Sequence, residues 1–198
     1  MWQLPADEAQ LAYAWQAAAP FPHIVIDDFV PVAALPGLLE ILDEEGVAPY
    51  AGDLFAFDAT APEPRSAELR DVRAAFGAAL AGPLSRITGK TVARADLRAY
   101  AYRVGHYLLP HSDHQEGLER VLAFAYYLPT PEPPRGGELE LYRCAVGADG
   151  AYTATVSARV LEPRANRLVV FDVSDVSLHQ VREVLGGVRL SLAGWFYA

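Results

Sequence analysis

Two histidines and one aspartate are the residues of this chain whose types and order point most clearly to chemistry. His111 and Asp113 stand two positions apart, and His179 follows 66 residues after Asp113. Two imidazoles and one carboxylate are the ligands with which proteins hold non-haem Fe(II) on one face, leaving open positions. In a β-strand, residues i and i+2 point to the same side, so His111 and Asp113 can bind one ion together. His179 would complete the triad from another strand.

A carboxylate receptor is predicted ten residues after His179. Arg189 carries a permanent charge on a planar fork that matches a carboxylate. Its neighbours are apolar, and a buried arginine without a partner would be very costly. In a strand, Ser191 and Ala193 share its face. A metal with open positions beside such a receptor indicates an iron oxygenase that uses an oxo-acid as co-substrate.

An ordered series of motifs resembles the Fe(II)/2-oxoglutarate oxygenases, specifically their prolyl-hydroxylase-like branch. HxD alone arises often by chance, whereas the whole series in this order is specific. It runs from about Tyr100 to Tyr197 and comprises YRVG (102–105), HSD (111–113), RVLAFAYYL (120–128), GGEL (136–139), LHQV (178–181) and RLS (189–191). Residues 21–45 also resemble the entry segment of this branch.

The resemblance implies the cofactors, the site and the reaction. Fe(II), 2-oxoglutarate and O₂ are expected, with ascorbate as a reductant. The implied site residues are His111, Asp113 and His179 as iron ligands, and Arg189, Ser191, Tyr127, Tyr102 and Leu139 in the 2-oxoglutarate pocket. The expected reaction is hydroxylation of an unactivated C–H bond, with a prolyl residue of a protein or peptide as substrate. An aspartate at 113, where a small residue would open a halide position, favours hydroxylation over halogenation.

Several alternatives stay open at this level. The enzyme could hydroxylate a free amino acid or a small metabolite. The chain could also be a non-catalytic metal-binding or sensing cupin-like barrel, although this does not explain a carboxylate receptor. A zinc hydrolase could use the same ligands, but no additional general base stands at a fixed spacing. Tyr127 and Tyr102 could be aromatic core residues. His106 and His114 are interpreted as structural or outer residues of the site, and His23 as structural.

Hydrophobic periodicity predicts an α+β, mainly β fold in one domain over residues 1–198. Residues 1–90 are expected to be mostly helical support, and the short strands over 91–198 indicate antiparallel sheets in a sandwich, barrel or jelly roll. The resemblance implies that this part is a double-stranded β-helix, a jelly roll of the cupin type. Helices are predicted at 5–19, 32–45 and 68–87, with a short strand at 23–27 and a loop at 49–65. Strands are predicted near 91–104, 107–113, 120–129, 138–143, 152–161, 167–172, 178–184 and 188–197.

Strand parity adds a prediction about the interior. Along 121–128, Val121, Ala123, Ala125 and Tyr127 share one face, and the larger apolar residues share the other. Small residues leading to one phenol would leave space for a ligand.

Substrate recognition is expected outside the iron core, in the loop 49–65 and in the proline-rich segment 129–135 (PTPEPPR). This segment departs from the family pattern and leaves the substrate open. The acidic residues of both loops favour a neutral or basic polypeptide; they are Asp53, Asp58, Glu63 and Glu132.

Composition limits the remaining possibilities. A net charge of −9 argues against nucleic acid or an anionic membrane as a partner. Cys144 is the single cysteine, so an intrachain disulfide is excluded. The first residues have no basic segment typical of a targeting peptide, and a cytoplasmic location is expected. The oligomeric state is left open.

Overall fold

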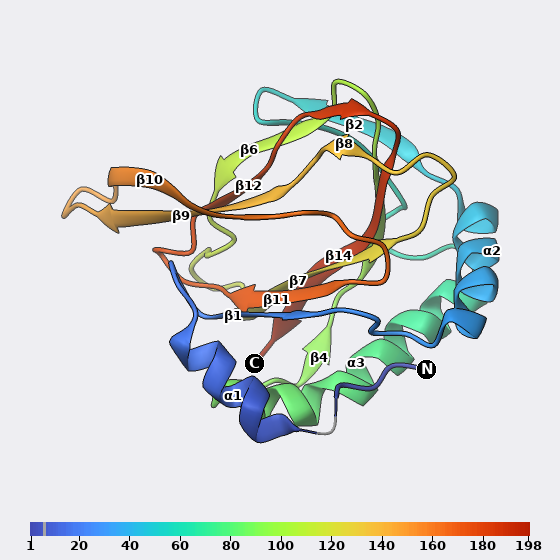
Figure 1. Ribbon diagram of the computed structural model, residues 1–198, viewed down its shortest axis with the longest axis horizontal. Helices are drawn as coiled ribbons and strands as arrows, with labels where there is room; N and C mark the ends of the chain where they lie inside the picture. Colours follow the sequence, from blue (N-terminus) through green and yellow to red (C-terminus); the bar gives the residue numbers. More distant parts are fainter. Residues whose placement is uncertain (6) are drawn as a thin grey trace.

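The computed structural model describes residues 1–5 and 7–198 and shows a curled antiparallel sheet with helices packed on one side (Figure 1). The helices are α1 (Glu8–Ala17), the 3₁₀ turn η1 (Val32–Ala34), α2 (Leu35–Glu45) and α3 (Ala67–Thr88). The strands are β1 (His23–Ile26), β2 (Ala48–Gly52), β3 (Phe55–Ala59), β4 (Arg94–Ala95), β5 (Arg98–Tyr102), β6 (Tyr107–His111), β7 (Arg120–Leu128), β8 (Arg135–Gly136), β9 (Leu139–Val146), β10 (Tyr152–Leu161), β11 (Leu168–Asp172), β12 (His179–Val181), β13 (Val184–Gly186) and β14 (Arg189–Tyr197).

The main sheet runs in the order β1-β11-β7-β14-β5-β3-β6-β12-β9-β10, with β2 paired to β3 and β4 to β14. It folds over so that the wall β1-β11-β7-β14-β5 faces the wall β6-β12-β9-β10. This is the predicted double-stranded β-helix, mainly β with supporting helices at the N-terminal side.

The predicted helices are confirmed, and their ends follow local capping. Asp7 begins α1 by accepting a hydrogen bond from the Gln10 backbone N–H at 2.9 Å. Ser66 does the same for Leu69 at the start of α3. That helix ends at Gly89, whose positive φ of 72° is the left-handed conformation that glycine adopts at low cost.

Two apolar layers lie on opposite sides of the β7 wall. Leu122, Phe124 and Tyr126 face the helices and share a core with residues of α2 and α3. Ala123, Ala125 and Tyr127 face the other wall and pack with Leu139, Leu141 and Phe171, among others. The predicted parity of β7 is confirmed for Ala123, Ala125 and Tyr127. Val121 is the exception, because it packs against the helix-side core.

The first ninety residues contribute more strand than predicted. Residues 49–65 were expected to form a loop, but β2 and β3 form a hairpin over Ala48–Ala59, and β3 joins the main sheet between β5 and β6. Phe55 and Phe57 alternate along β3, and Phe57 packs against Tyr100 and Tyr102. The high Pro, Gly and Asp content hid this alternation. β1 also pairs with β11 at the edge of the sheet.

Several predicted strand ends were wrong. The stretch 91–104 divides into β4 and β5, and the strand predicted at 107–113 ends at His111. The segment 178–184 divides into β12 and the start of β13, which pairs with β8. The strand predicted at 138–143 continues to Val146 and forms with β10 a hairpin that projects from the body (Figure 1).

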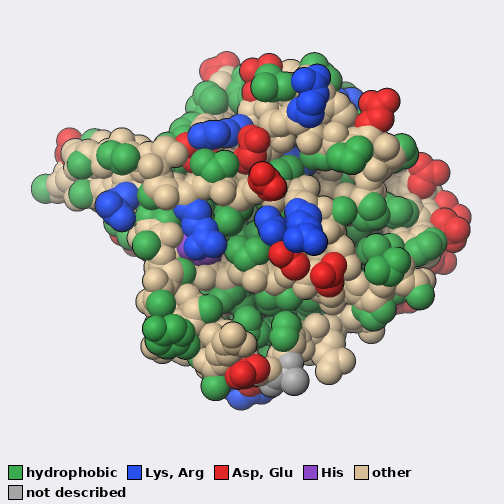
Figure 2. All heavy atoms as spheres, viewed as in Figure 1, with side chains coloured by type: hydrophobic (Ala, Val, Ile, Leu, Met, Phe, Trp, Pro, Cys, Tyr) green, Lys and Arg blue, Asp and Glu red, His purple; other side chains and the backbone are tan. Residues whose placement is uncertain are grey.

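Acidic side chains gather at the side of the molecule where α2 lies (Figure 2), where Glu40, Asp43 and Glu44 are exposed. Over the described part of the chain, no helix combines the length and apolarity needed to cross a bilayer.

Candidate iron and co-substrate site

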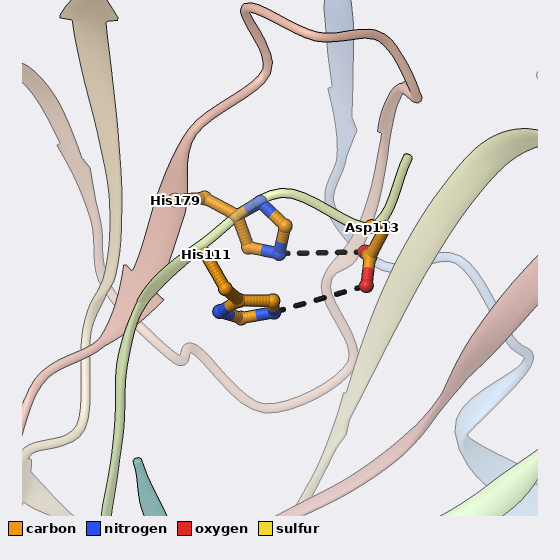
Figure 3. A group of neighbouring side chains, drawn as sticks. All are labelled: His111, Asp113 and His179. Atoms are coloured by element: carbon orange, nitrogen blue, oxygen red, sulfur yellow. Dashed lines mark ion pairs between the residues drawn. The ribbon is translucent and has the colours of Figure 1, made fainter. Parts of the chain in front are cut away.

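His111, Asp113 and His179 converge at one end of the space between the walls (Figure 3). β12 lies beside β6, and His179 is the direct cross-strand partner of His111. The imidazole centroids are therefore 4.3 Å apart. Asp113 lies just after the end of β6, so its carboxylate reaches the histidines from the following loop and not from the strand that was predicted.

The ligand atoms face one another, with a distance of 3.7 Å from His111 Nε2 to Asp113 Oδ1 and 3.5 Å from His179 Nε2 to Asp113 Oδ2. The other ring nitrogens face backbone carbonyls: His111 Nδ1 lies 2.9 Å from Leu109 O, and His179 Nδ1 lies 2.9 Å from Ser177 O. A carbonyl oxygen can only accept, so each Nδ1 carries the proton and each Nε2 lone pair is free for a metal.

Serine hydrogen bonds connect two loops. One loop follows His111 and carries Asp113, and the other precedes His179. The Ser112 hydroxyl donates to Ser174 O at 3.0 Å and accepts from the His114 backbone N–H. Ser177 Oγ also donates to Ser174 O at 2.8 Å. The turn after His111 and the turn before His179 are therefore held together without metal.

The electrostatics favour neutral imidazole. Burial, followed by the neighbouring His111, lowers the pKa of His179 to about 4, against the opposing effect of Asp113. Neutral His179 is the form that binds a metal ion.

A cavity of about 250 Å³ extends from this triad between the walls. Arg189 lies in its wall, 3% exposed, with Nη1 3.3 Å from Ser191 Oγ. Its guanidinium carbon lies 4.8 Å from the ring centroid of Tyr102 and 4.9 Å from that of Tyr127. Leu139 is buried in the opposite wall. Four residues of the predicted co-substrate pocket, Arg189, Ser191, Tyr102 and Leu139, therefore line one cavity, and Tyr127 contacts Arg189.

Two polar atoms at Arg189 and Tyr127 lack a hydrogen-bond partner among the described residues. Among the described residues, no carboxylate pairs with Arg189, and Arg189 Nε and the Tyr127 hydroxyl are buried without a hydrogen bond. Burial raises the pKa of the Tyr102 hydroxyl and keeps it a donor. A buried charge without a counter-charge and a buried hydroxyl without a partner are costly, and a carboxylate ligand would satisfy them.

Gly137 makes room for this arginine. Its φ is +72°, and a Cβ there would lie 3.0 Å from Arg189 Cδ and 2.9 Å from Val184 Cγ2. The GGEL motif therefore does more than form a turn, because its second glycine allows the backbone to approach the carboxylate receptor.

Sequence reasoning missed two residues beside the triad. The Arg120 guanidinium lies 3.7 Å from the centroid of the Trp195 ring and donates from Nη1 to Asp113 O at 3.3 Å. Trp195 lines the cavity, and its Nε1 is buried without a partner. Arg120 and Trp195 meet only through the pairing of β7 with β14, so no local pattern indicates them.

The remaining histidines lie outside the triad. His114 faces Asp175, with 3.3 Å between Nε2 and Oδ1. His23 is buried on β1, with Nδ1 2.8 Å from Phe21 O. His106 belongs to the turn before β6.

Comparison with known proteins agrees with this fold and donor set. The family model of the 2OG-Fe(II) oxygenase superfamily matches residues 97–197. The chain is 35% identical over 190 residues to prolyl 3-hydroxylase OGFOD1 of Xenopus laevis, covering 91% of this chain and 35% of the relative. It is 37% identical over 117 residues to the Mus musculus OGFOD1, covering 58% of this chain and 21% of the relative. The chain thus spans about a third or less of the length of these relatives.

Solved structures show the same fold. A Pseudomonas putida prolyl-4-hydroxylase superposes with a TM-score of 0.67 at 24% identity, covering 94% of this chain and 98% of that one. A prolyl hydroxylase from Trichoplax adhaerens, in complex with a hypoxia inducible factor oxygen degradation domain peptide fragment, gives 0.68 at 15% identity, covering 96% and 88%.

The chain combines a double-stranded β-helix with a His-Asp-His group that could hold a metal ion and a buried arginine in the same cavity, which fits an Fe(II)-dependent dioxygenase. It belongs to the 2OG-Fe(II) oxygenase superfamily. Fe(II), 2-oxoglutarate and O₂ are the cofactor and co-substrates of this class, and the residues present fit both the iron and the dicarboxylate.

Proposed function

We propose that the chain hydroxylates a prolyl residue of a protein or peptide. The observation that carries the oxygenase assignment is the buried Arg189 in the cavity of the triad, with a polar atom that a bound carboxylate would satisfy. The prolyl assignment is supported by the relatives, which are prolyl hydroxylases by name. Because the chain spans only part of their length, the substrate is a proposal for this chain.

In this proposal, His111 and His179 would hold Fe(II) through Nε2, and Asp113 through its carboxylate. Iron bound there would supply the oxidative decarboxylation of 2-oxoglutarate with O₂, which yields succinate, CO₂ and a hydroxylated product.

The protein residues orient the co-substrate and keep water away. Arg189 and Ser191 bind the distal carboxylate, with the Tyr127 and Tyr102 hydroxyls as further donors. Leu139, with Ala123 and Ala125, provides an apolar wall that excludes water from the chain of the co-substrate.

The substrate is proposed to enter beside the β2–β3 hairpin. Phe55 and Phe57 line the cavity and stack with a centroid distance of 5.0 Å. Aromatic rings offer a rigid apolar surface that suits a pyrrolidine ring. Trp195 Nε1, which has no acceptor in the described part of the chain, is available to a peptide carbonyl.

The segment 129–135 makes a smaller contribution in this proposal than expected from the sequence. Thr130 Oγ1 donates to Val188 O at 3.1 Å and Arg135 Nη2 to Leu185 O at 3.2 Å, so the segment packs on the turn before β14. The acidity of the hairpin region is also partly neutralised, because Asp58 pairs with Arg103 at 2.7 Å and Glu63 with Arg73 at 3.6 Å.

Succinate formation tests this function. Protein reconstituted anaerobically with Fe(II) would be given 2-oxoglutarate and O₂ with a panel of prolyl peptides, the same peptides with alanine for proline, and free amino acids. We expect succinate above the uncoupled rate, and a mass increase of one oxygen, with prolyl peptides alone. Stimulation by free amino acids instead would identify a small-molecule hydroxylase, and the absence of uncoupled turnover would favour a non-catalytic barrel.

The wider setting is also a proposal. We infer one domain over 1–198, a cytoplasmic location, a polypeptide partner rather than nucleic acid or membrane, and ascorbate as a reductant. The net charge of −9 supports the choice of partner. Ascorbate would be tested by the number of turnovers before inactivation, with and without it.

A further inference from the structure

A buried carboxylate links three strands of the wall that carries His179. Glu140 lies in β9, and its side chain is 4% exposed. It accepts hydrogen bonds from Arg182 Nε at 2.7 Å, from Arg182 Nη2 at 2.9 Å, from Gln180 Nε2 at 2.6 Å and from the Ser157 hydroxyl. Ser157 belongs to β10, Gln180 to β12, and Arg182 follows β12 directly. One side chain therefore connects β10, β9 and β12.

The strand that carries His179, β12, is short and is paired less regularly on one side than on the other. β12 has three residues, and its pairing with β6 is irregular between His179 and Val181. On the other side it pairs regularly with β9 over all three residues, with Gln180 directly opposite Glu140. β9 is therefore the neighbour that holds β12 in continuous register.

Alternation along the strands places the carboxylate cluster behind the metal site. His179 and Val181 line the cavity, whereas Gln180 points to the opposite face of the sheet, where Glu140 lies. A displacement of Gln180 relative to β9 would move the backbone of its neighbour His179 and with it Nε2. The bidentate contact with Arg182 gives the cluster fixed geometry and not only attraction.

We propose that Glu140 is a positioning residue for the iron ligand His179, an inference that rests on the proposed function. Its carboxylate holds β12 in register and so keeps His179 Nε2 at the distance that Asp113 and His111 require. Glu140 touches neither the metal nor the co-substrate. Hydrogen bonding from Arg182 is the largest cause that lowers the pKa of Glu140, to about 2, and burial opposes it. The Glu140 carboxylate is therefore charged at neutral pH.

The test uses Co(II) as an oxygen-stable probe whose visible absorption reports the ligand geometry. Glu140→Ala should raise the Co(II) dissociation constant about tenfold, as expected when an outer contact of a metal ligand is lost, and should change the absorption bands. Asp27→Ala is the matched control. It removes another carboxylate that binds an arginine, Arg167, through two nitrogens at 2.6 and 3.0 Å, but at the opposite end of the sheet order.

Glu140→Gln keeps the side-chain shape and one acceptor, so its Co(II) affinity should lie between wild type and Glu140→Ala; it also serves alone if the alanine variant does not fold. Wild-type affinity and spectrum in the Glu140 variants, whatever their melting temperature, would overturn the positioning role. His179→Ala separates the two proposals. If it loses Co(II) while the Glu140 variants do not, only the positioning role fails; if it keeps wild-type affinity, the iron site itself is wrong.

Discussion

Side chains in this site are oriented by hydrogen bonds and ring contacts that leave their ligand-binding atoms available. His111 and His179 each donate Nδ1–H to the carbonyl two residues earlier, which directs Nε2 toward Asp113. Arg189 contacts Ser191 and two aromatic rings but has no counter-charge among the described side chains. The residues are therefore preorganised for a cation at one end of the cavity and for an anion at the other.

The metal assignment predicts the loss of iron from two variants. Asp113→Ala and His179→Ala each remove one of three ligands and should abolish stoichiometric Fe(II) binding at neutral pH. His114→Ala, which changes a histidine paired with Asp175 outside the triad, should bind iron as wild type does. Iron content after anaerobic desalting measures this, and a full complement in both ligand variants would contradict the assignment.

The anion receptor predicts a separable effect. Arg189→Ala should lose a charge-assisted contact of about 1.5–3 kcal/mol, which corresponds to a rise of about ten- to a hundred-fold in the 2-oxoglutarate dissociation constant. Iron binding should persist. Titration of 2-oxoglutarate into the Fe(II) protein, followed by the charge-transfer absorption, measures the constant. An unchanged constant would show that the co-substrate carboxylate binds elsewhere.

Single elements supply the two ends of the cavity. β14 brings Arg189, Ser191 and Ala193 to one face, as predicted, while Leu190 and Leu192 pack toward the helices. β3 adds aromatic residues that the sequence did not indicate. Its Phe55 pairs with Leu108 of β6 and lines the same cavity. The hairpin thus contributes Phe55 and Phe57 to the lining of the cavity.

This placement predicts a substrate-specific defect. Phe55→Ala should raise the peptide KM roughly tenfold by removing an aromatic contact surface, while iron and 2-oxoglutarate binding stay unchanged. Tyr13→Ala is the control, because Tyr13 lies on α1 and is 75% exposed. Peptide-dependent succinate formation measures the effect. Wild-type KM in Phe55→Ala would move substrate recognition away from the hairpin.

The stability of the whole molecule depends on the protonation state of a buried histidine, His23. Burial is the largest cause that lowers the pKa of His23 below its ordinary 6.5. The folded protein therefore binds fewer protons than the unfolded chain once the pH falls below about 6.5. The contribution of neutral His23 to the free energy of unfolding is complete above about pH 6.5. It is lost as the pH falls toward the pKa of His23 in the folded protein.

Acid sensitivity should therefore decrease when His23 is removed. His23→Gln keeps a donor for Phe21 O but does not titrate, so the free energy of unfolding should fall less between pH 6.5 and 5 than in wild type. Urea unfolding of the metal-free proteins at each pH measures the slope. Metal-free His179, with its pKa near 4, contributes to the same window in both proteins and cancels in the difference. Equal slopes would exclude His23 as a source of acid sensitivity.

Local patterns were sufficient for much of this molecule. The caps at Asp7, Ser66 and Gly89 depend on neighbours within four residues, and the parities of β7 and β14 depend on alternation alone. The order of the motifs indicated the metal ligands and the residues around Arg189. Such features are determined by nearby residues, so the sequence carries them directly.

Only the tertiary structure decided how distant segments meet. The pairing of β12 with β6 places His179 opposite His111, and the pairing of β3 with β5 and β6 brings the hairpin to the cavity. The contact of Arg120 with Trp195 and the Glu140 cluster also join residues from separate strands. These contacts depend on the strand order of the curled sheet, which is set by packing across the whole chain and leaves no periodic signal in any one segment.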